Sequence, residues 1–432
     1  MPQPPTFRGE PQQSLHRGQS DRFSIRDPRG NLNPWPPGRS FGVGLQKIIR
    51  LTYSAVARVS IRAFGSRLVL SPRFWRLLPN APITDTPWNQ SARLDDMAGS
   101  GTKTVLVTGA SGQDGTYLIE RLVAEGHEVH GLCHSAEGSA RLTALFPQSI
   151  GYVADLAETS SIVSIVESVE PTHIFNLAGN TSVERSWRFP VETADVLGVG
   201  PVRLLDSAWN LQERLSRPVR FLQASSAEIF GDAVEIPQRE ITPRLPVTPY
   251  GAAKSFAHQM VAVYRARGML ASSAILYNHE SPRRPEAFVA RKISREAARI
   301  SLGLSTTLTL GNIDVYRDWG YAPDYVDAMI AILDAPRADE YIVATGVAHS
   351  VKQFVEHAFA YVGIEDWQAH VVIDPALYRP ADPKQLVGDP SRLRDLGWNP
   401  SVDFEQLVHI MVEADLASLK AEMAASQPSA AS

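Results

Sequence analysis

A glycine-rich turn between an apolar run and a helical pattern restricts the fold of this chain more than any other feature. The apolar run covers residues 105–107, and Gly109, Gly112 and Gly115 follow it at intervals of three residues. Glycines at this spacing let the backbone approach a pyrophosphate, which is stabilised by the amides at the N-terminus of the next helix. An ordinary strand-to-helix turn needs at most one glycine. The spacing therefore predicts a dinucleotide-binding unit in a parallel α/β sheet.

Similar apolar runs continue along the chain, with helical patterns between them. They cover residues 128–132, 151–153, 173–177, 219–224 and 273–276. Alternating strands and helices predict an α/β fold, here a Rossmann-type doubly wound parallel sheet. We expect this dinucleotide-binding domain over residues 101–277. A smaller mixed region over residues 278–416 would mainly bind substrate and send some segments back to the sheet. Residues 417–432 are rich in Ala and Ser and predict a flexible tail.

The first 100 residues are rich in Pro, Gly, Ser and Arg and contain no clear strand pattern, which predicts a disordered basic extension. Between residues 41 and 70, basic residues interleave with apolar ones and could form an amphipathic helix for a membrane surface or an organelle address. Alternatively, the natural start is Met97 and the preceding residues are a mis-called extension, because a short polar segment leads from Met97 into the first strand. Both interpretations stay open.

The distribution of charge and cysteine narrows the class of protein. Residues 1–96 contain 14 Lys and Arg against 6 Asp and Glu, which leaves 28 against 40 in the rest of the chain. An acidic body of this kind does not bind nucleic acid through its bulk charge. The single cysteine, Cys133, excludes an intrachain disulfide and suits a reducing compartment, so we expect a cytoplasmic protein. No apolar run reaches the roughly 18 residues of a membrane span.

Chemically useful side chains are concentrated between residues 225 and 254. The preceding apolar run delivers Ser226 and Glu228 to the carboxyl edge of the sheet, where open α/β sheets hold their ligands. Tyr250 and Lys254 are four residues apart, which places them on one face of a helix. A neighbouring ammonium group lowers the pKa of a phenol from about 10, which would make Tyr250 a base. A solvated helix face is the alternative interpretation of this pair.

Several longer strings give the chain a family resemblance. They are VTGASGQDG, QASSAEIFG, TPYGAAK, NHESPRR and RDWGYAPDYV. With them, residues 103–416 resemble the extended short-chain dehydrogenases/reductases and, within that superfamily, the GDP-mannose 4,6-dehydratases. The last two strings are the most specific, because a generic nucleotide-sugar epimerase is not expected to carry both.

This resemblance implies an activity and an assembly. The activity is that of an NADP-dependent lyase, which converts GDP-mannose to GDP-4-dehydro-6-deoxy-mannose and water. Hydride would pass from C4 of the hexose to NADP and from there to C6. The resemblance also implies a homodimer or homotetramer that pairs through helices including the Tyr-x-x-x-Lys helix.

The resemblance implies catalytic roles for four residues. Tyr250 takes the proton from the hexose 4-hydroxyl, while Lys254 tunes Tyr250 and holds the cofactor ribose. Ser226 hydrogen-bonds the developing C4 carbonyl. Glu228 removes the C5 proton, which the C4 ketone makes acidic.

Binding residues carry over from the same motifs. The implied cofactor-binding residues are Gly109, Ser111, Gly112, Gln113, Asp114, Gly115, Asp155, Leu156, Leu177, Ala178, Gly179, Lys254, His279 and Arg284. The implied substrate-binding residues are Asn278, Lys292, Arg317 and Arg379, and no metal ligand is implied. On the residues alone, Asp155 could instead cap a helix and the basic residues could form surface ion pairs.

Three departures from the family pattern keep other functions open. Ala227 stands where the family has a Ser that is thought to help protonate the leaving C6 hydroxyl. His134 and Ser135 replace an Arg pair suited to the 2′-phosphate of NADP, so NAD is possible, and Glu192 replaces a Tyr near the cofactor. One alternative is a GDP-4-keto-6-deoxyhexose reductase or GDP-hexose epimerase, which would not need Glu228. Another is a catalytically weak paralogue that binds nucleotide sugar.

Overall fold

The computed structural model describes residues 101–378, 381, 383 and 385–426. The predictions for residues 1–100 and 427–432, and for Arg379, lie outside these residues. No helix in the described part has the length and apolar composition required to cross a bilayer.

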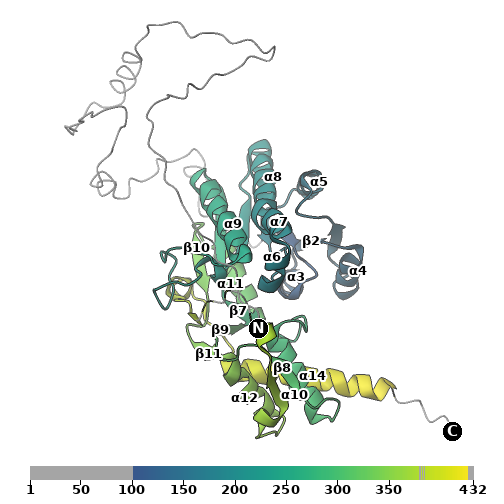
Figure 1. Cartoon of the computed structure of the whole chain (residues 1–432). Coiled ribbons are helices and arrows are strands. Elements are labelled where there is room, and N and C mark those ends of the chain that lie inside the picture. Colours follow the sequence, from purple (N-terminus) through teal and green to yellow (C-terminus); the bar gives the residue numbers. More distant parts are fainter. Residues whose placement is uncertain (1–100, 379–380, 382, 384, 427–432) are drawn as a thin grey trace, which may run out of the picture. The chain divides into compact units, whose positions relative to one another are not determined.

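The larger part of the described chain is built on a seven-stranded parallel sheet (Figure 1). Its strands are β1 (Thr104–Thr108), β2 (Glu128–Cys133), β3 (Ile150–Val153), β4 (His173–Asn176), β5 (Arg220–Ser226), β6 (Leu270–Leu276) and β10 (Glu340–Val343). They lie in the order β10-β6-β5-β4-β1-β2-β3, and β1 pairs in parallel with both β2 and β4. The winding therefore reverses beside β1, where doubly wound sheets bind their ligands. The predicted Rossmann-type doubly wound sheet is confirmed.

Helices cover both faces of this sheet, because successive residues of a buried strand point to opposite faces. Val105 and Val107 of β1 pack into one core, and Leu106 packs into the other. The first core is closed by α3 (Gln113–Ala124), α4 (Ala136–Leu145) and α11 (Ala322–Asp334). The second is closed by α5 (Thr159–Val169), α8 (Gly200–Leu215) and α9 (Pro249–Ala266). Between β4 and α8 lie α6 (Val183–Arg188), α7 (Pro190–Ala194) and the π-helical segment η3 (Asp195–Val199).

The start of α9 is fixed by local sequence. The Thr248 side chain accepts a hydrogen bond from the Gly251 amide at 2.9 Å. Pro249 occupies the first helical position, where its missing N–H would have no helical partner in any case. Tyr250 and Lys254 consequently lie one turn apart on the buried side of the helix.

The smaller part of the described chain lies in the lower half of Figure 1 and has its own core. Its second sheet contains β9 (Tyr316–Tyr321), which pairs with β7 (Asn278–Glu280), β11 (Ala348–Ser350) and β13 (Gln385–Leu386). A separate pair is formed by β8 (Leu308–Leu310) and β12 (Val371–Ile373). The helices are α10 (Val289–Ser301), α12 (Val351–Tyr361), α13 (Ser391–Arg394) and α14 (Phe404–Ser426). Trp319, Phe354 and Phe404 pack together at the centre of this core.

The C-terminal end differs from the prediction of a flexible tail after residue 416. Helix α14 continues to Ser426. Leu419 is buried, and Arg295 of α10 forms an ion pair with Glu422 at 3.2 Å. The Ala-rich composition misled the prediction, because Ala also favours helix when one face of the segment finds a partner.

Candidate active site

The turn between β1 and α3 has the geometry of an anion site. Gly109 has a φ of +69°, and a Cβ on Gly115 would lie 2.3 Å from the Gly109 carbonyl oxygen, so both positions require glycine. Gly112 precedes α3 and offers no side-chain cap. The first amides of α3 are therefore available to an anion, such as a pyrophosphate, at the positive end of the helix dipole.

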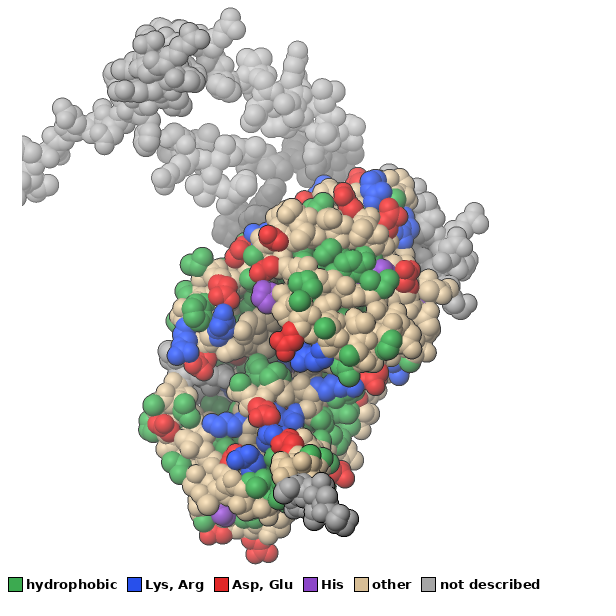
Figure 2. Space-filling view, turned by 90° about the vertical axis from the view of Figure 1, so that its right-hand side faces the viewer, with side chains coloured by type: hydrophobic (Ala, Val, Ile, Leu, Met, Phe, Trp, Pro, Cys, Tyr) green, Lys and Arg blue, Asp and Glu red, His purple; other side chains and the backbone are tan. Residues whose placement is uncertain are grey.

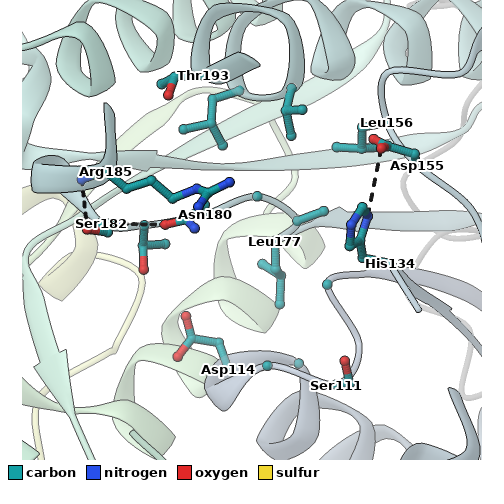
Figure 3. A pocket seen from close by; sticks show the side chains of 18 of the residues that line it. Ser111, Asp114, His134, Asp155, Leu156, Leu177, Asn180, Ser182, Arg185 and Thr193 are labelled. Atoms are coloured by element: carbon teal, nitrogen blue, oxygen red, sulfur yellow. Dashed lines mark hydrogen bonds and ion pairs between the residues drawn. The ribbon is translucent and has the colours of Figure 1, made fainter. Parts of the chain in front are cut away.

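This turn forms one wall of a cavity of about 800 Å³ (Figure 3). Most of the predicted cofactor-binding residues line it: Gly109, Ser111, Gly112, Gln113, Asp114, Gly115, Asp155, Leu156, Leu177, Ala178, Gly179 and Arg284. Lys254 and His279 are not among the lining residues. The uncapped helix, the close-packed glycines and the size of the cavity fit a dinucleotide.

At one end of the cavity, side chains from the ends of β2 and β3 lie near the glycine turn. Asp155 Oδ2 is 3.8 Å from His134 Nδ1, a contact drawn in Figure 3, and Asp155 Oδ1 accepts a hydrogen bond from the Ala157 amide at 2.9 Å. Asp155 thus lines the cavity and also caps its own turn. Arg141 of α4 donates a hydrogen bond to the Ser111 carbonyl at 2.7 Å.

The four predicted catalytic residues are supplied by β5, by η4 (Ala227–Ile229) and by α9. The Tyr250 hydroxyl is hydrogen-bonded to Ser226, and the charge of Glu228 acts on the same phenol. Glu228 itself is 9% exposed. Lys254 Nζ donates a hydrogen bond to the Ala224 carbonyl at 2.9 Å and lies 5.9 Å from the centre of the Tyr250 ring.

The prediction that Lys254 lowers the pKa of Tyr250 is wrong for this structure. The pKa of Tyr250 is raised to about 12, mainly by burial and also by the charge of Glu228, against the opposing hydrogen bond with Ser226. Burial also lowers the pKa of Lys254 to about 8. The ammonium group is directed to the Ala224 carbonyl, so at this distance it does not offset the desolvation of the phenol.

A partly buried ion pair connects α3 to β7. His279 Nε2 lies 2.9 Å from Asp114 Oδ2, and His279 Nδ1 lies 2.7 Å from the Tyr277 carbonyl oxygen. Burial alone would lower the pKa of His279, but the Asp114 carboxylate raises it above its usual value. Burial would likewise raise the pKa of Asp114, but His279 lowers it. His279 therefore contacts a lining residue of the cavity, not the cavity itself.

The predicted substrate-binding residues lie in the smaller part of the chain. Asn278 is on β7, Lys292 on α10 and Arg317 on β9, and Asn278 is paired with Trp319 of β9. Arg317 Nη1 donates hydrogen bonds to the carbonyl oxygens of Tyr316 and Pro383, at 2.7 and 2.9 Å. None of the three lines the cavity of Figure 3.

Comparison with known proteins assigns a family to this geometry. The model of the GDP-mannose 4,6 dehydratase family matches residues 106–411. GDP-mannose 4,6 dehydratase 1 of Arabidopsis thaliana is 42% identical over 332 residues, which cover 74% of this chain and 91% of the relative. The chain belongs to the GDP-mannose 4,6-dehydratase family. The resemblance seen in the sequence is confirmed.

Solved structures similar to this dehydratase family member hold nicotinamide cofactors. RMD of Pseudomonas aeruginosa, complexed with NADPH, is 25% identical and has a TM-score of 0.61, with 73% of this chain and 100% of that chain covered. UDP-glucose 4-epimerase of Thermus thermophilus, complexed with NAD, is 25% identical and has a TM-score of 0.63, with 72% and 98% covered. A nicotinamide cofactor is therefore supported, without a choice between its two forms.

Sequence reasoning missed part of the cavity wall of this dehydratase family member. The missed residues include Asn180, Thr181, Ser182, Arg185 and Thr193. Figure 3 shows the Arg185 side chain extending into the cavity, and Arg185 Nη2 forms an ion pair with Glu192 at 2.9 Å. Ser182 caps α6, which is the local sequence signal that the chain turns here. Only the packed structure shows which face of that helix lines the cavity.

Proposed function

We propose that this protein converts GDP-mannose to GDP-4-dehydro-6-deoxy-mannose and water. One observation carries the proposal: the charge of a nearly buried carboxylate, Glu228, acts on the phenol of Tyr250. A reductase or epimerase would need Tyr250 and Lys254 but would have no task for Glu228. Membership of the family supports the same conclusion.

The residues around the cavity would hold a nicotinamide dinucleotide. The amides at the start of α3 would bind the pyrophosphate, and Asp155 would contact the adenosine half. When bound, the cofactor accepts hydride from C4 of the hexose and returns it to C6. The protein therefore has to place the hexose, exclude water and move protons.

Tyr250 and Ser226 would perform the first proton transfer. Tyr250 takes the proton of the 4-hydroxyl, and Ser226 donates a hydrogen bond to the oxygen that becomes the C4 carbonyl. With a pKa of about 12, the Tyr250 phenol needs a nearby positive charge to act near neutral pH. Lys254, which is protonated below about pH 8, would supply part of that charge.

Glu228 would perform the elimination. Its carboxylate takes the C5 proton, and the same proton passes to the C6 oxygen, which leaves as water. When hydride is returned to C6, C5 takes up a proton, and this balances the proton that Tyr250 took from the 4-hydroxyl and then releases. Ala227 has no proton to donate, and its methyl group is buried in an apolar cluster with Ile229, Phe230 and Tyr277. We infer that Glu228 serves both steps in this protein.

We also propose that NADP is the preferred cofactor and that NAD is the alternative. No carboxylate follows β2 to bind the 2′-hydroxyl of NAD, since the residues there are His134 and Ser135. Arg141 lies at the carbonyl of Ser111, beside the glycine turn. Its guanidinium would take the role of the Arg pair found in the family, because Arg binds phosphate well.

For partners, we propose a homodimer or homotetramer in the cytoplasm. Phe256 and Val263 of α9 are 47% and 55% exposed, as expected if this helix meets a second copy.

Figure 2 shows Lys and Arg side chains gathered where the larger and smaller parts of the described chain meet, which would suit the diphosphate of GDP-mannose. The free cysteine, Cys133, is buried and suits a reducing compartment.

The test is direct. Purified full-length protein is incubated with GDP-mannose and catalytic NADP, and the product is followed by a mass loss of one water. We expect water loss in the wild type and none in Glu228→Gln or Tyr250→Phe. Absence of water loss from wild-type protein that still binds the nucleotide sugar would reject the dehydratase. Offering the 4-keto sugar with NADPH then tests the reductase, and bound dinucleotide after purification tests the inert paralogue.

A further inference from the structure

A buried histidine lies on α9, one turn after Lys254. His258 of α9 is 1% exposed and makes two hydrogen bonds. Its Nδ1 is 3.0 Å from Ser225 Oγ on β5, and its Nε2 is 2.5 Å from Glu340 Oε2 on β10. Arg244 donates a further hydrogen bond to the same carboxylate oxygen at 2.6 Å. This network joins β5 and β10 of the large sheet to α9, the helix that covers them.

The contact between His258 and Ser225 is one of three similar contacts that hold α9 against β5. Tyr250, Lys254 and His258 follow one another at intervals of four along α9, so they lie on one face. Each is bound by one of three consecutive residues of β5. Lys254 bonds the carbonyl of residue 224, His258 bonds Ser225, and Tyr250 bonds the side chain of residue 226. These three contacts together fix the position of Tyr250 relative to β5.

The partners of His258 determine its tautomer. Burial would raise the pKa of Glu340, but hydrogen bonding with His258 and the charges around it lower that pKa, so Glu340 is an ionised acceptor. His258 Nε2 therefore carries the proton and donates it to Glu340, which leaves Nδ1 as acceptor from the Ser225 hydroxyl. The neutral imidazole is the only form that satisfies both partners in these directions.

A hydrolytic role does not fit this arrangement. Ser, His and Glu in this order resemble the relay of a serine hydrolase. Ser225, however, is 3% exposed, is absent from the lining of the cavity, and has its hydroxyl beside His258 in the interior. A substrate cannot reach its oxygen without opening the contact between β5 and α9.

We propose that His258 is a positioning residue, which holds α9 in register on β5 and so keeps Tyr250 and Lys254 in place for the reaction. This inference rests on the proposed dehydratase function for its kinetic test. His258 itself contacts neither the cavity nor, in this proposal, the hexose. It would affect the reaction only by holding α9 through Ser225.

Protonation of His258 would reverse its hydrogen bond to Ser225. A second proton must go to Nδ1, which then donates to the Ser225 oxygen in place of accepting from it. The charged groups that act on the imidazole are Glu340 of β10, Arg244 of the segment before α9, and Arg265 of α9 itself, while β5 presents only the Ser225 hydroxyl. Burial and the two arginines lower the pKa of His258, against the effect of Glu340. The neutral form is therefore retained at neutral pH.

The kinetic test compares His258→Gln and His258→Phe with a matched change on the same helix. Tyr264→Phe is the control, because it removes one hydrogen bond from α9, to Asp206 Oδ1 at 3.0 Å, away from the β5 contacts. We expect kcat to fall by about 10-fold in His258→Gln and about 100-fold in His258→Phe, with KM for GDP-mannose changed by less than about 3-fold. Tyr264→Phe should keep kcat.

Equal losses of kcat in His258→Phe and Tyr264→Phe would overturn the proposal. A second measurement does not depend on the substrate. Hydrogen exchange of the amides of residues 249–256 should be faster in His258→Phe than in the wild type and unchanged in Tyr264→Phe. If the wild type releases no water from GDP-mannose, the proposed function fails, and these exchange rates still decide the positioning role. Unchanged exchange in His258→Phe would reject it.

Discussion

Tyr250 and Lys254 are held by residues of β5 more than by one another. Lys254 is bonded to a main-chain carbonyl, and its pKa is lowered to about 8 by burial. Tyr250 has a pKa of about 12 for the same reason. In the absence of ligand, desolvation therefore shifts these two pKa values more than Lys254 and Tyr250 shift each other's. A positive charge bound near the phenol is required to make Tyr250 a base.

A single residue, Arg141, is also expected to set the preference for NADP over NAD, because its guanidinium would bind the 2′-phosphate. In Arg141→Ala, KM for NADP should rise by about 10- to 100-fold, which corresponds to a lost hydrogen bond between charged groups. KM for NAD should change by less than about 2-fold, because NAD lacks the 2′-phosphate. Steady-state kinetics with both cofactors measure this ratio.

The matched control for Arg141→Ala is Arg121→Ala. Arg121 is an exposed arginine of α3 that pairs with Glu125 at 2.9 Å. Its removal should leave both KM values unchanged. An equal loss of affinity for NAD and NADP in Arg141→Ala would show that Arg141 shapes the glycine turn and does not recognise the phosphate.

At the scale of elements, two strand-to-helix units build the site. The β1/α3 unit supplies an uncapped helix start, and the β5/α9 unit supplies a strand end held against the side of a helix. Both units place polar groups at the carboxyl edge of the sheet, because parallel strands all end there. The first is suited to an anion and the second to proton transfer.

The packing of the β1/α3 unit gives a prediction for Gly115. In Gly115→Ala the new Cβ would lie 2.3 Å from the Gly109 carbonyl oxygen and 2.8 Å from Ala110 Cα, so the turn must open. We expect NADPH affinity to fall by at least about 100-fold and stability to fall by about 1–3 kcal/mol. Fluorescence titration with NADPH and denaturant unfolding measure the two effects. Gly101→Ala, which meets no atom within 4 Å, is the control, and equal NADPH affinity in both variants would contradict this account.

At the scale of the molecule, the ion pair of Asp114 and His279 joins the large sheet region to the second sheet. The pair is supported by the stacking of His279 on Tyr325, with ring centres 4.6 Å apart. Breaking one partner of a pair that is largely shielded from water leaves the other charge without compensation. One of the contacts between the two parts of the described chain therefore depends on the protonation of a histidine.

This dependence predicts a pH effect on stability. The pKa of His279 is raised, so its contribution is complete below about pH 6.5 and is lost as the pH rises through the folded-state value. The pKa of Asp114 is lowered, so its contribution is present above about pH 4 and is lost as the pH falls further. His279→Gln should thus lose about 3 kcal/mol of stability near pH 5–6 and less at pH 9.

Urea unfolding of wild type and His279→Gln across this pH range measures the difference. His370→Gln is the control, because half-buried His370 contacts the Thr306 carbonyl and the Phe359 ring but no carboxylate among the described contacts. A loss of stability in His279→Gln that stays constant from pH 5 to pH 9 would show that packing, and not charge, is the source.

The sequence by itself determined the local and repetitive features of this protein. The glycine spacing from Gly109 to Gly115, the alternation of apolar runs with helical patterns, and the Tyr250–Lys254 interval each depend on residues close together in the chain. Their geometry follows from backbone rules, so the Rossmann-type sheet, the helix start at the cavity and the family were accessible from sequence.

Tertiary structure alone decided what depends on burial and on distant partners. The pKa of Tyr250 follows from desolvation, which no spacing of residues reveals, and so its direction was predicted wrongly. The contacts of His258 with Glu340, and of His279 with Asp114, join residues 82 and 165 positions apart. The helix after residue 416 exists because Leu419 and Glu422 find partners on other elements. The free energies of desolvation and of ion pairing depend on which residues become neighbours, and only folding brings those residues together.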